Sequence, residues 1–424
     1  MIKQIFKKII VFIITLEARL VLWRHKPKIV AVTGSVGKTS TKDAIAAILS
    51  RNFEVRKSQK SFNSEIGVPL VILGCENAWL NPIKWILNIF RGVAVFIKKG
   101  FPEWLVLEMG VERPGDMKKL MSFVKPNIAV VTALAEIPSH VEFFAGPKEL
   151  ACEKEKVLKN LKEGDFAILN SDDEAVFDLK KKTKANVITF GFGEDSEIVA
   201  SNYRIVPKGI SFKVDYRGVS IPIRLNGVLG KHHIYSVLAS LAVGSVVNMN
   251  FVDMSEVLFN YQSPPGRLNL IDGIKGSLVL DDTYNSSPLA LRAALETMKE
   301  IPAQRKIVIL GDMLELGKYT IEAHRSMAKH IIDSGTKIVF TVGPRARFIS
   351  EALKENNFEK ENIFEFSNST EPLANLDGLI KEGDLILVKG SQSMRMEKIV
   401  EEIMAEPERK AELLVRQEKA WLNK

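Results

Sequence analysis

Cysteine is nearly absent from this chain of 424 residues, which contains only Cys75 and Cys152. Two cysteines can form neither a disulfide framework nor a four-cysteine zinc ribbon, and their scarcity indicates a reducing compartment. The sequence also lacks internal short-period repeats, low-complexity segments and basic runs interleaved with stacking aromatic residues. The last absence argues against a nucleic-acid-binding protein.

The bulk composition is that of an ordinary globular protein. Apolar residues make up 46% of the chain and charged residues 26%, and the length is sufficient for two or three domains with full cores. The net charge of +8 suits polyanionic ligands such as nucleotides, or an anionic membrane surface. A lysine-rich composition without functional meaning explains the same value equally well.

Short apolar β-rich runs alternate with helical patterns, which predicts an α/β fold with parallel sheets. The predicted strands are residues 28–33, 104–108 and 127–132 and, further along, 277–280, 306–310, 338–342 and 385–388. A period of two between Val187 and Arg224 predicts an antiparallel edge. Paired prolines in Tyr261–Asn269 indicate a linker. We therefore expect an N-terminal apolar and basic helix (1–27), a central ATP-binding domain (28–264) and a C-terminal Rossmann-like domain (265–424).

The segment "TGSVGKTS" follows the first predicted strand and precedes a predicted helix at 39–50. Standard phosphate-binding loops of the P-loop type would have glycine at position 32, where this chain has Val32, so the loop is a short form. Its backbone N–H groups and the helix N-terminus would face phosphate, with Lys38 on the β- and γ-phosphates and Thr39 on Mg²⁺. The alternative is a glycine turn that caps a helix beside an exposed lysine. The candidate phosphate contacts are Gly34, Ser35, Val36, Gly37, Lys38, Thr39 and Ser40.

Five further segments complete a pattern that runs from Lys28 to Val400. They are "NSEIGVPL" (63–70), "LVLEMGVERPGDM" (105–117), "LDDTYNSSP" (280–288), "ILGDMLELG" (309–317) and "LVKGSQSMRMEKIV" (387–400). Together with the short loop, this pattern resembles the Mur ligase family, in particular its MurF-type branch, which adds D-alanyl-D-alanine to UDP-N-acetylmuramoyl tripeptide. The related folylpolyglutamate synthases share the loop but lack the last two segments.

The resemblance implies an ATP-dependent ligase that forms an amide through an acyl phosphate. It implies ATP and Mg²⁺ as cofactors, UDP-muramoyl tripeptide and D-Ala-D-Ala as substrates, and a cytoplasmic monomer. The residues that match the family's catalytic positions are Lys38, His140 and Lys154, and those that match its metal site are Thr39, Glu108, His140 and Lys154. The family modifies the lysine at position 154 to a carbamate. Arg267, Asp282 and Asn285 match its nucleotide contacts from the C-terminal domain.

Several positions depart from the family pattern. Ala133 and about two extra residues precede His140, and "GKHHIYSVLAS" places His233 and Ser236 where the family has asparagines that contact adenine. Lys389 and Arg395 are candidate partners for a substrate carboxylate, or else surface cations near a helix start. Only 27 residues precede the first strand, whereas the family has an N-terminal uridine-binding domain of about 100 residues, a typical small-domain size. An amide ligase for a lipid-linked acceptor and a non-catalytic ATP-binding protein are therefore alternatives.

Two segments are apolar with basic stripes. The uncharged run Ile9–Leu16 has only eight residues, too short to span a bilayer, and Ile9, Ile13, Leu16 and Leu20 recur at helical spacing. Asn81-Pro82 begins a second helix, which ends at Gly100 and carries a predicted basic stripe of Lys84, Asn88, Arg91 and Lys98. Four tryptophans lie at the flanks, at positions 23, 79, 85 and 104. The two helices either contact the inner face of a membrane peripherally or pack on each other as part of the core.

Overall fold

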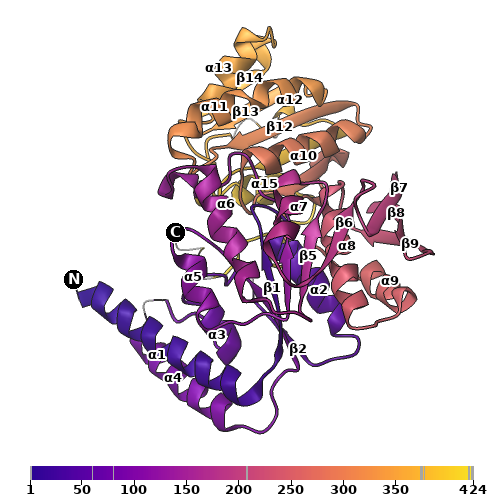
Figure 1. Ribbon diagram of the computed structural model, residues 1–424. Helices are drawn as coiled ribbons and strands as arrows, with labels where there is room; N and C mark the ends of the chain where they lie inside the picture. Colours follow the sequence, from indigo (N-terminus) through magenta and orange to yellow (C-terminus); the bar gives the residue numbers. More distant parts are fainter. Residues whose placement is uncertain are drawn as a thin grey trace.

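The computed structural model describes residues 2–59, 61–79, 81–206, 209–372, 376, 378–418 and 421 (Figure 1). Two sheets organise these residues. The first sheet has the strand order β2-β3-β1-β4-β5-β6-β7-β8-β9, and the second has the order β10-β11-β15-β12-β13-β14. Both are flanked by helices on their two faces, as the alternating sequence pattern predicts. The α/β fold class is confirmed.

Three of the nine strands of the first sheet lie close to the predicted positions 28–33, 104–108 and 127–132, whereas the strands at residues 55–57 and 166–170 were not predicted. The nine strands follow in chain order. They are β1 (Lys28–Thr33), β2 (Val55–Lys57), β3 (Trp104–Glu108), β4 (Ile128–Val131), β5 (Phe166–Asn170), β6 (Asn186–Gly191), β7 (Ile198–Val206), β8 (Gly209–Tyr216) and β9 (Val219–Asn226). In the sheet order from β2 to β7 each adjacent pair of strands is parallel, whereas the pairs β7–β8 and β8–β9 are antiparallel. The predicted antiparallel edge is therefore present, but it begins at β7. Val187, at its predicted start, belongs to the parallel strand β6.

The second sheet comprises β10 (Asn269–Asp272), β11 (Leu278–Asp282), β12 (Arg305–Gly311), β13 (Ile338–Val342), β14 (Ile363–Phe366) and β15 (Asp384–Lys389). Only β10 is antiparallel to its neighbour. The helices of this half include α10 (Pro288–Glu300), α11 (Thr320–Arg325), α12 (Met327–Asp333), α13 (Arg347–Glu355), α15 (Glu397–Ile403) and α16 (Lys410–Leu413). The helices α10, α13 and α15 pack against the strands of the sheet. The predicted linker, Tyr261–Asn269, connects the two sheets.

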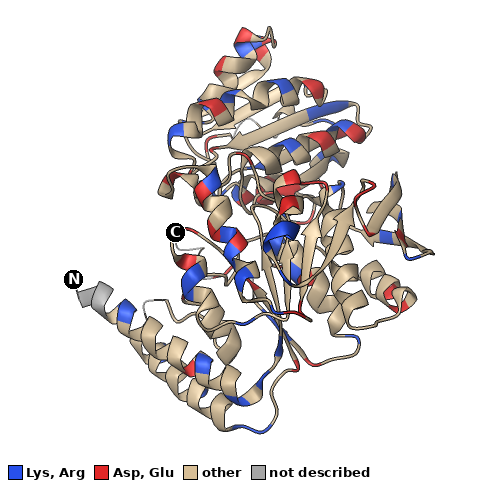
Figure 2. Ribbon diagram, in the orientation of Figure 1, with Lys and Arg blue, Asp and Glu red and all other residues tan. Residues whose placement is uncertain are grey.

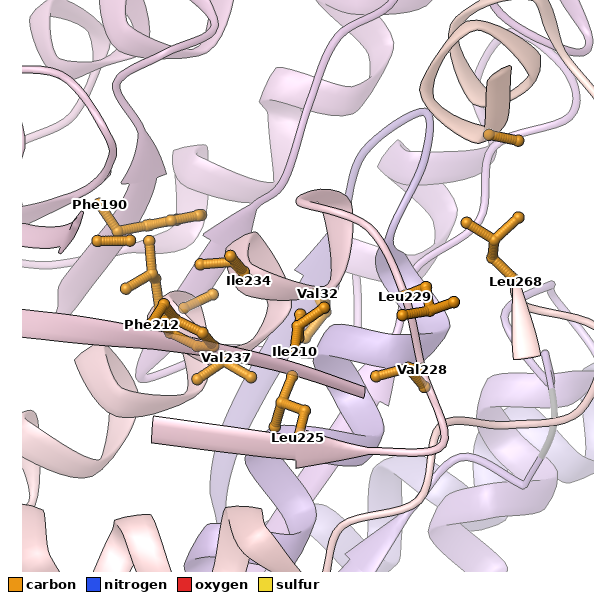
Figure 3. Close-up of a cluster of buried hydrophobic side chains, with 14 of the residues drawn as sticks. Val32, Phe190, Ile210, Phe212, Leu225, Val228, Leu229, Ile234, Val237 and Leu268 are labelled. Carbon is orange, nitrogen blue, oxygen red and sulfur yellow. The ribbon is translucent and has the colours of Figure 1, made fainter. Parts of the chain in front are cut away.

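The core follows from sequence patterns that bury both faces of each sheet. The strand β1 reads KIVAVT and is buried from Ile29 onward, as expected of a parallel strand covered on both sides. One face packs on α2 (Lys38–Leu49), α8 (His232–Val246) and α9 (Phe251–Phe259). Figure 3 shows part of this cluster, which includes Phe212 of β8 and Ile234 of α8. The cluster continues into the second sheet through Leu280, so the two halves share one apolar interior.

The opposite face of the first sheet packs on α3 (Gly67–Leu73), α5 (Asp116–Met121) and α7 (Glu174–Phe177), and α6 (Pro147–Glu155) packs on α5. Two longer helices, α1 (Ile2–His25) and α4 (Pro82–Ile97), lie side by side beyond α3 at the lower left of Figure 1. The side chain of Asn81 caps α4 by accepting a hydrogen bond from Lys84 N, 3.0 Å away. In the described part of the chain, no helix combines the length and the apolar character needed to cross a membrane.

Candidate active site

The loop between β1 and α2 has a backbone that only glycine allows at two positions. Gly37 begins α2 in the left-handed region, with φ of 78°. Gly34 has φ of 146°, and a Cβ atom there would lie 2.0 Å from Thr132 Oγ1. The Thr132 hydroxyl instead donates a hydrogen bond to Val36 O over 2.6 Å, and Ser35 N donates to Ala133 O over 2.7 Å. The end of β4 thus fixes the shape of the loop.

The loop encloses the ammonium group of Lys38. The Nζ atom donates to Gly34 O over 2.9 Å and to Ser35 O over 3.3 Å. Desolvation lowers the pKa of Lys38, the charge of Glu108 opposes this shift, and that of Arg267 adds to it. A cation held by carbonyl groups inside a glycine turn is in the position expected for contact with phosphate oxygens. The alternative was an exposed lysine beside a helix cap, but the Lys38 ammonium instead donates to carbonyl groups inside the loop.

The carboxylate of Glu108 lies at the carboxyl end of β3 and is only 1% exposed. Thr39 Oγ1 donates to Glu108 Oε2 over 2.9 Å, and Asn63 Nδ2 donates to Oε1 over 2.8 Å. Ser58 Oγ accepts from the backbone N–H of Glu108 at 3.1 Å. The predicted neighbours Thr39 and Glu108 are therefore in contact. Asn63 was not predicted as a site residue, although it is the first residue of the segment "NSEIGVPL", which contributes to the family resemblance.

The structure distinguishes Lys154, near the end of α6, from the lysines that follow it in the chain. Lys154 is 5% exposed, and its Nζ atom donates to Ser35 Oγ in the phosphate loop over 3.0 Å. Lys156 instead pairs with Glu153, and Lys159 is exposed. Burial lowers the pKa of Lys154 well below the ordinary value, and the charge of Lys38 lowers it further. A lowered pKa favours the neutral amine, which is the form of lysine that reacts with CO₂.

Residues of the second sheet reach the phosphate loop across the domain boundary. Arg267 Nη2 donates to Thr39 Oγ1 over 3.2 Å, and its guanidinium lies 3.9 Å from the centroid of the Tyr284 ring. Tyr284 in turn donates from its hydroxyl to Ser61 Oγ over 2.6 Å. Arg267 Nε is buried and has no hydrogen-bond partner among the described residues. This orphaned donor fits an anionic ligand between the two halves.

The predicted nucleotide contact Asp282 and the predicted carboxylate partner Lys389 bind each other. Lys389 is 1% exposed, and its Nζ atom donates to Asp282 Oδ2 over 2.6 Å and to Asn285 O over 2.9 Å. Arg395 donates from Nε to Glu397 Oε1 over 2.5 Å. Both cations therefore have acidic partners within the chain. Their contact with a substrate carboxylate stays a prediction.

Two adjacent histidines begin α8 close to these charges. His232 Nδ1 and His233 Nε2 are buried and lack hydrogen-bond partners among the described residues. Burial lowers the pKa of His232 to about 4, and the positive charges of Lys389 and Arg267 contribute. Burial also lowers the pKa of His233 well below its ordinary value, so the neutral form of both rings is favoured. Ser236 is directed elsewhere, because its Oγ atom accepts a hydrogen bond from Thr41 Oγ1 over 3.1 Å and so joins α8 to α2.

His140 contacts the second half of the chain. Its Nδ1 atom lies 2.6 Å from Glu315 Oε2, and its backbone has φ of 70°. The pKa of Glu315 is lowered by its hydrogen bond to His140. Glu108 contacts Thr39 and Asn63 rather than His140, and the described residues contain no group of three or more His, Cys, Asp or Glu side chains arranged for a metal. The joint metal role of Glu108 and His140 stays a prediction.

Comparison with known proteins places this geometry in a family. The Mur ligase middle domain matches residues 32–83 and 91–244, and the Mur ligase glutamate ligase domain matches residues 266–392. The UDP-N-acetylmuramoyl-tripeptide–D-alanyl-D-alanine ligase of Bacillus subtilis is 30% identical over 387 residues, which cover 90% of this chain and 76% of the relative. The chain belongs to the Mur ligase family. The enzyme of the same name from Rickettsia prowazekii is 28% identical over 89% of this Mur ligase and 78% of its own length.

Solved structures agree with this assignment. A MurF ligase from Thermotoga maritima in complex with ADP superposes with a TM-score of 0.75 at 25% identity, covering 94% of this Mur ligase and 84% of that chain. MurF from Acinetobacter baumannii gives a TM-score of 0.77 at 23% identity, covering 92% and 79%, and shows the shared fold. The family match begins at residue 32 and is interrupted at residues 84–90, so α1 and the middle of α4 lie outside it.

Proposed function

We propose that the protein is an ATP-dependent amide ligase that joins D-alanyl-D-alanine to a UDP-N-acetylmuramoyl tripeptide in peptidoglycan precursor synthesis. The observation that carries this proposal is the convergence of Lys38, Thr39, Glu108, Lys154 and Arg267 on one short phosphate loop. The names of its relatives supply the substrates. In this proposal residues 28–264 bind ATP, and residues 265–424 bind the incoming dipeptide.

The reaction brings two anions together, because the tripeptide carboxylate attacks the γ-phosphate of ATP to give an acyl phosphate and ADP. The amine of the dipeptide then displaces phosphate, loses a proton and forms the amide. Lys38 would leave its carbonyl partners to bind the transferred phosphoryl group, and Arg267 would approach it from the other half of the chain. Because Arg267 and Tyr284 contact Thr39 and Ser61, closure of the two halves completes the site.

Mg²⁺ fits the oxygen atoms that meet beside the loop. Mg²⁺ prefers hard oxygen ligands, and Thr39 Oγ1 lies 2.9 Å from Glu108 Oε2, so one ion could bind both. We propose that Thr39 and Glu108 hold Mg²⁺, with His140 and a carbamate on Lys154 as further ligands. The ion would neutralise phosphate charge. Asp282 and Asn285 would contact the nucleotide from the second half.

Phosphate release by the purified protein tests the proposal. We expect release only when ATP, UDP-muramoyl tripeptide and D-Ala-D-Ala are all present, with tripeptides ending in lysine and in diaminopimelate assayed in parallel. The exposed Lys159 offers a matched control, because Lys159→Ala should retain activity that Lys38→Ala loses. Release that does not depend on the dipeptide, or no release with either tripeptide, would contradict the proposal.

A lipid-linked carboxylate is the second candidate acceptor. The observation that favours it is the apolar exposed surface of α1 and α4, which lies on the same half of the chain as the phosphate loop. The same assay separates the two candidates when a muramoyl peptide on a polyprenyl carrier in detergent replaces the uridine nucleotide. Faster release with the lipid-linked acceptor would replace the first candidate with the second.

A further inference from the structure

The helices α1 and α4 form a helical pair, here called the N-terminal hairpin, at one end of the molecule (Figure 1). Arg24 Nη2 donates to Ile97 O over 3.3 Å, and His25 Nε2 lies 3.1 Å from Val95 O. The side chain of Glu17 lies so close to Gly92 that any Cβ at Gly92 would clash with its carboxyl group. The expectation that the helices pack on each other is therefore confirmed.

Each helix nevertheless buries only one face. The buried residues are Ile10, Ile14, Ala18 and Val21 of α1, and Trp85, Asn88 and Gly92 of α4. Asn88, predicted as part of a basic stripe, instead donates to Glu76 O over 2.8 Å in the interior. Trp85 and Trp104 are also buried, so of the four predicted flanking tryptophans only Trp23 and Trp79 are exposed.

The opposite faces of both helices are apolar and exposed to solvent. Twelve of the nineteen exposed large hydrophobic side chains in the described chain lie on these two helices. They are Phe6, Ile9, Phe12, Leu16, Leu20 and Trp23 of α1, and Ile83, Ile86, Leu87, Phe90, Val93 and Ile97 of α4. Phe12 is 70% exposed and Phe90 is 68% exposed. Contiguous exposed apolar surface of this kind marks an interaction site.

The charges beside this apolar face are of one sign. The exposed Lys8, Lys84 and Arg91 lie along its borders, and α1 also carries the exposed Lys7, Arg19 and Arg24. Figure 2 shows mostly basic residues among the charges of the two helices. The only acidic residue in α1 or α4 is Glu17, which is directed at Gly92 between the helices. A broad apolar face bordered by basic residues is the pattern of a helix that lies in a membrane interface.

This charge pattern discriminates between possible occupants. In a symmetric dimer the same patch would face itself and bring basic borders together, which costs free energy. An anionic bilayer instead offers phosphate groups to the basic borders and acyl chains to the apolar face. The match to the Mur ligase middle domain begins after α1 and omits residues 84–90, so α1 and part of α4 lie outside that match.

We propose that the N-terminal hairpin is a membrane-docking surface, whose apolar faces on α1 and α4 insert into the interface of an anionic bilayer without crossing it. Lys84 and Arg91 would contact lipid phosphates. Phe12 and Phe90, which have few protein contacts to lose, would enter the acyl boundary. The proposal does not depend on the substrate of the ligase, because it concerns a surface separate from the phosphate loop.

Co-sedimentation of the full chain with vesicles tests the proposal. We expect binding to phosphatidylcholine vesicles that contain phosphatidylglycerol, weaker binding to phosphatidylcholine alone, and weaker binding at high salt. The double variant Lys84→Glu/Arg91→Glu should bind anionic vesicles at least about 25-fold more weakly, because each basic residue near the surface contributes a factor of about five. Phe12→Glu/Phe90→Glu should lose about tenfold for each side chain.

Matched variants remote from the hairpin serve as controls. Val252→Glu/Ile321→Glu introduces two glutamates at exposed apolar positions and is the control for the Phe12 and Phe90 variant. Lys329→Glu/Lys360→Glu reverses two exposed basic charges and is the control for the Lys84 and Arg91 variant. We expect both controls to bind vesicles as the wild type does, and all variants to retain circular dichroism and phosphate release. Absence of vesicle binding by the wild type at low salt would overturn the proposal. Self-association that Phe12→Glu/Phe90→Glu abolishes, without vesicle binding, would assign the surface to a second copy instead.

Discussion

Replacement of Lys154 tests whether its buried amine acts as a cation or as a carbamate. We predict that Lys154→Ala and Lys154→Arg are equally inactive in the phosphate-release assay. Arginine keeps the positive charge but cannot take up CO₂, so a role as ammonium would leave Lys154→Arg partly active. A carbamate is a carboxylate, so acetate or propionate added to Lys154→Ala should restore part of the activity.

The structure sets the expected magnitudes. Loss of one preorganised charged group at a transferring phosphoryl costs about 10²–10³ in kcat, or about 3–4 kcal/mol. Stability should change much less, because in the described structure the Lys154 amine makes one hydrogen bond, to Ser35 Oγ, with a net contribution of about 1 kcal/mol. Removal of the buried amine also removes its desolvation cost, which offsets part of the lost hydrogen-bond energy. We expect Tm to shift by less than about 3 °C.

The pH dependence of stability provides an independent reading of the same residue. The pKa of Lys154 is lowered in the folded protein. As the pH falls from 10.5, Lys154 is therefore protonated in the unfolded chain before it is protonated in the folded protein. As the pH falls from 10.5 toward the folded-state pKa of Lys154, the wild type should therefore lose stability relative to Lys154→Ala. Urea unfolding of both proteins at several pH values in CO₂-free buffer measures this difference.

Two results would refute this reasoning. The first is near-normal turnover of Lys154→Arg, which would show that charge alone suffices. The second is normal turnover of Lys154→Ala, which would make Lys154 a structural lysine despite its contact with Ser35. A ¹³C resonance from labelled bicarbonate, present in the wild type and absent from both variants, would confirm the carbamate directly.

Three further outcomes are expected. Lys38→Ala should lower phosphate release at least about 100-fold with Tm unchanged, because it removes the cation that faces the transferred phosphoryl group; turnover near that of the wild type would exclude the loop from the mechanism. Glu108→Gln should keep the fold, since an amide can still bond Thr39, but should raise the Mg²⁺ concentration needed for half-maximal activity; an unchanged Mg²⁺ titration would exclude Glu108 as a ligand. Burial raises the pKa of Glu17 to about 7, so ionisation is disfavoured in the folded state, and Glu17→Gln should raise Tm at pH 8 but not at pH 4; equal shifts at both values would contradict this.

The sequence alone determined the local structure around the phosphate loop. The apolar run Lys28–Thr33 and the glycines Gly34 and Gly37 specify a strand, a tight turn and a helix, because each depends on neighbours within a few residues. The same holds for β11, β12, β13 and β15 of the second sheet, which contain continuous apolar runs, but not for β10 and β14, which were not predicted. Motif resemblance supplied the family, because the motifs keep their order and spacing along the chain.

Only the tertiary structure decided which side chains meet. Lys154 and Lys159 both follow the helical pattern of a charged face, and only the packing of α6 against the loop buries the first and exposes the second. His140 pairs with Glu315, far along the chain, and Lys389 pairs with Asp282 rather than standing free for a substrate. The hairpin is similar: helical spacing predicted apolar stripes on α1 and α4, but the sequence could not show that each helix buries one apolar face and exposes another. Contacts between residues distant in sequence depend on how the elements pack, and periodicity within one element carries no information about its partner.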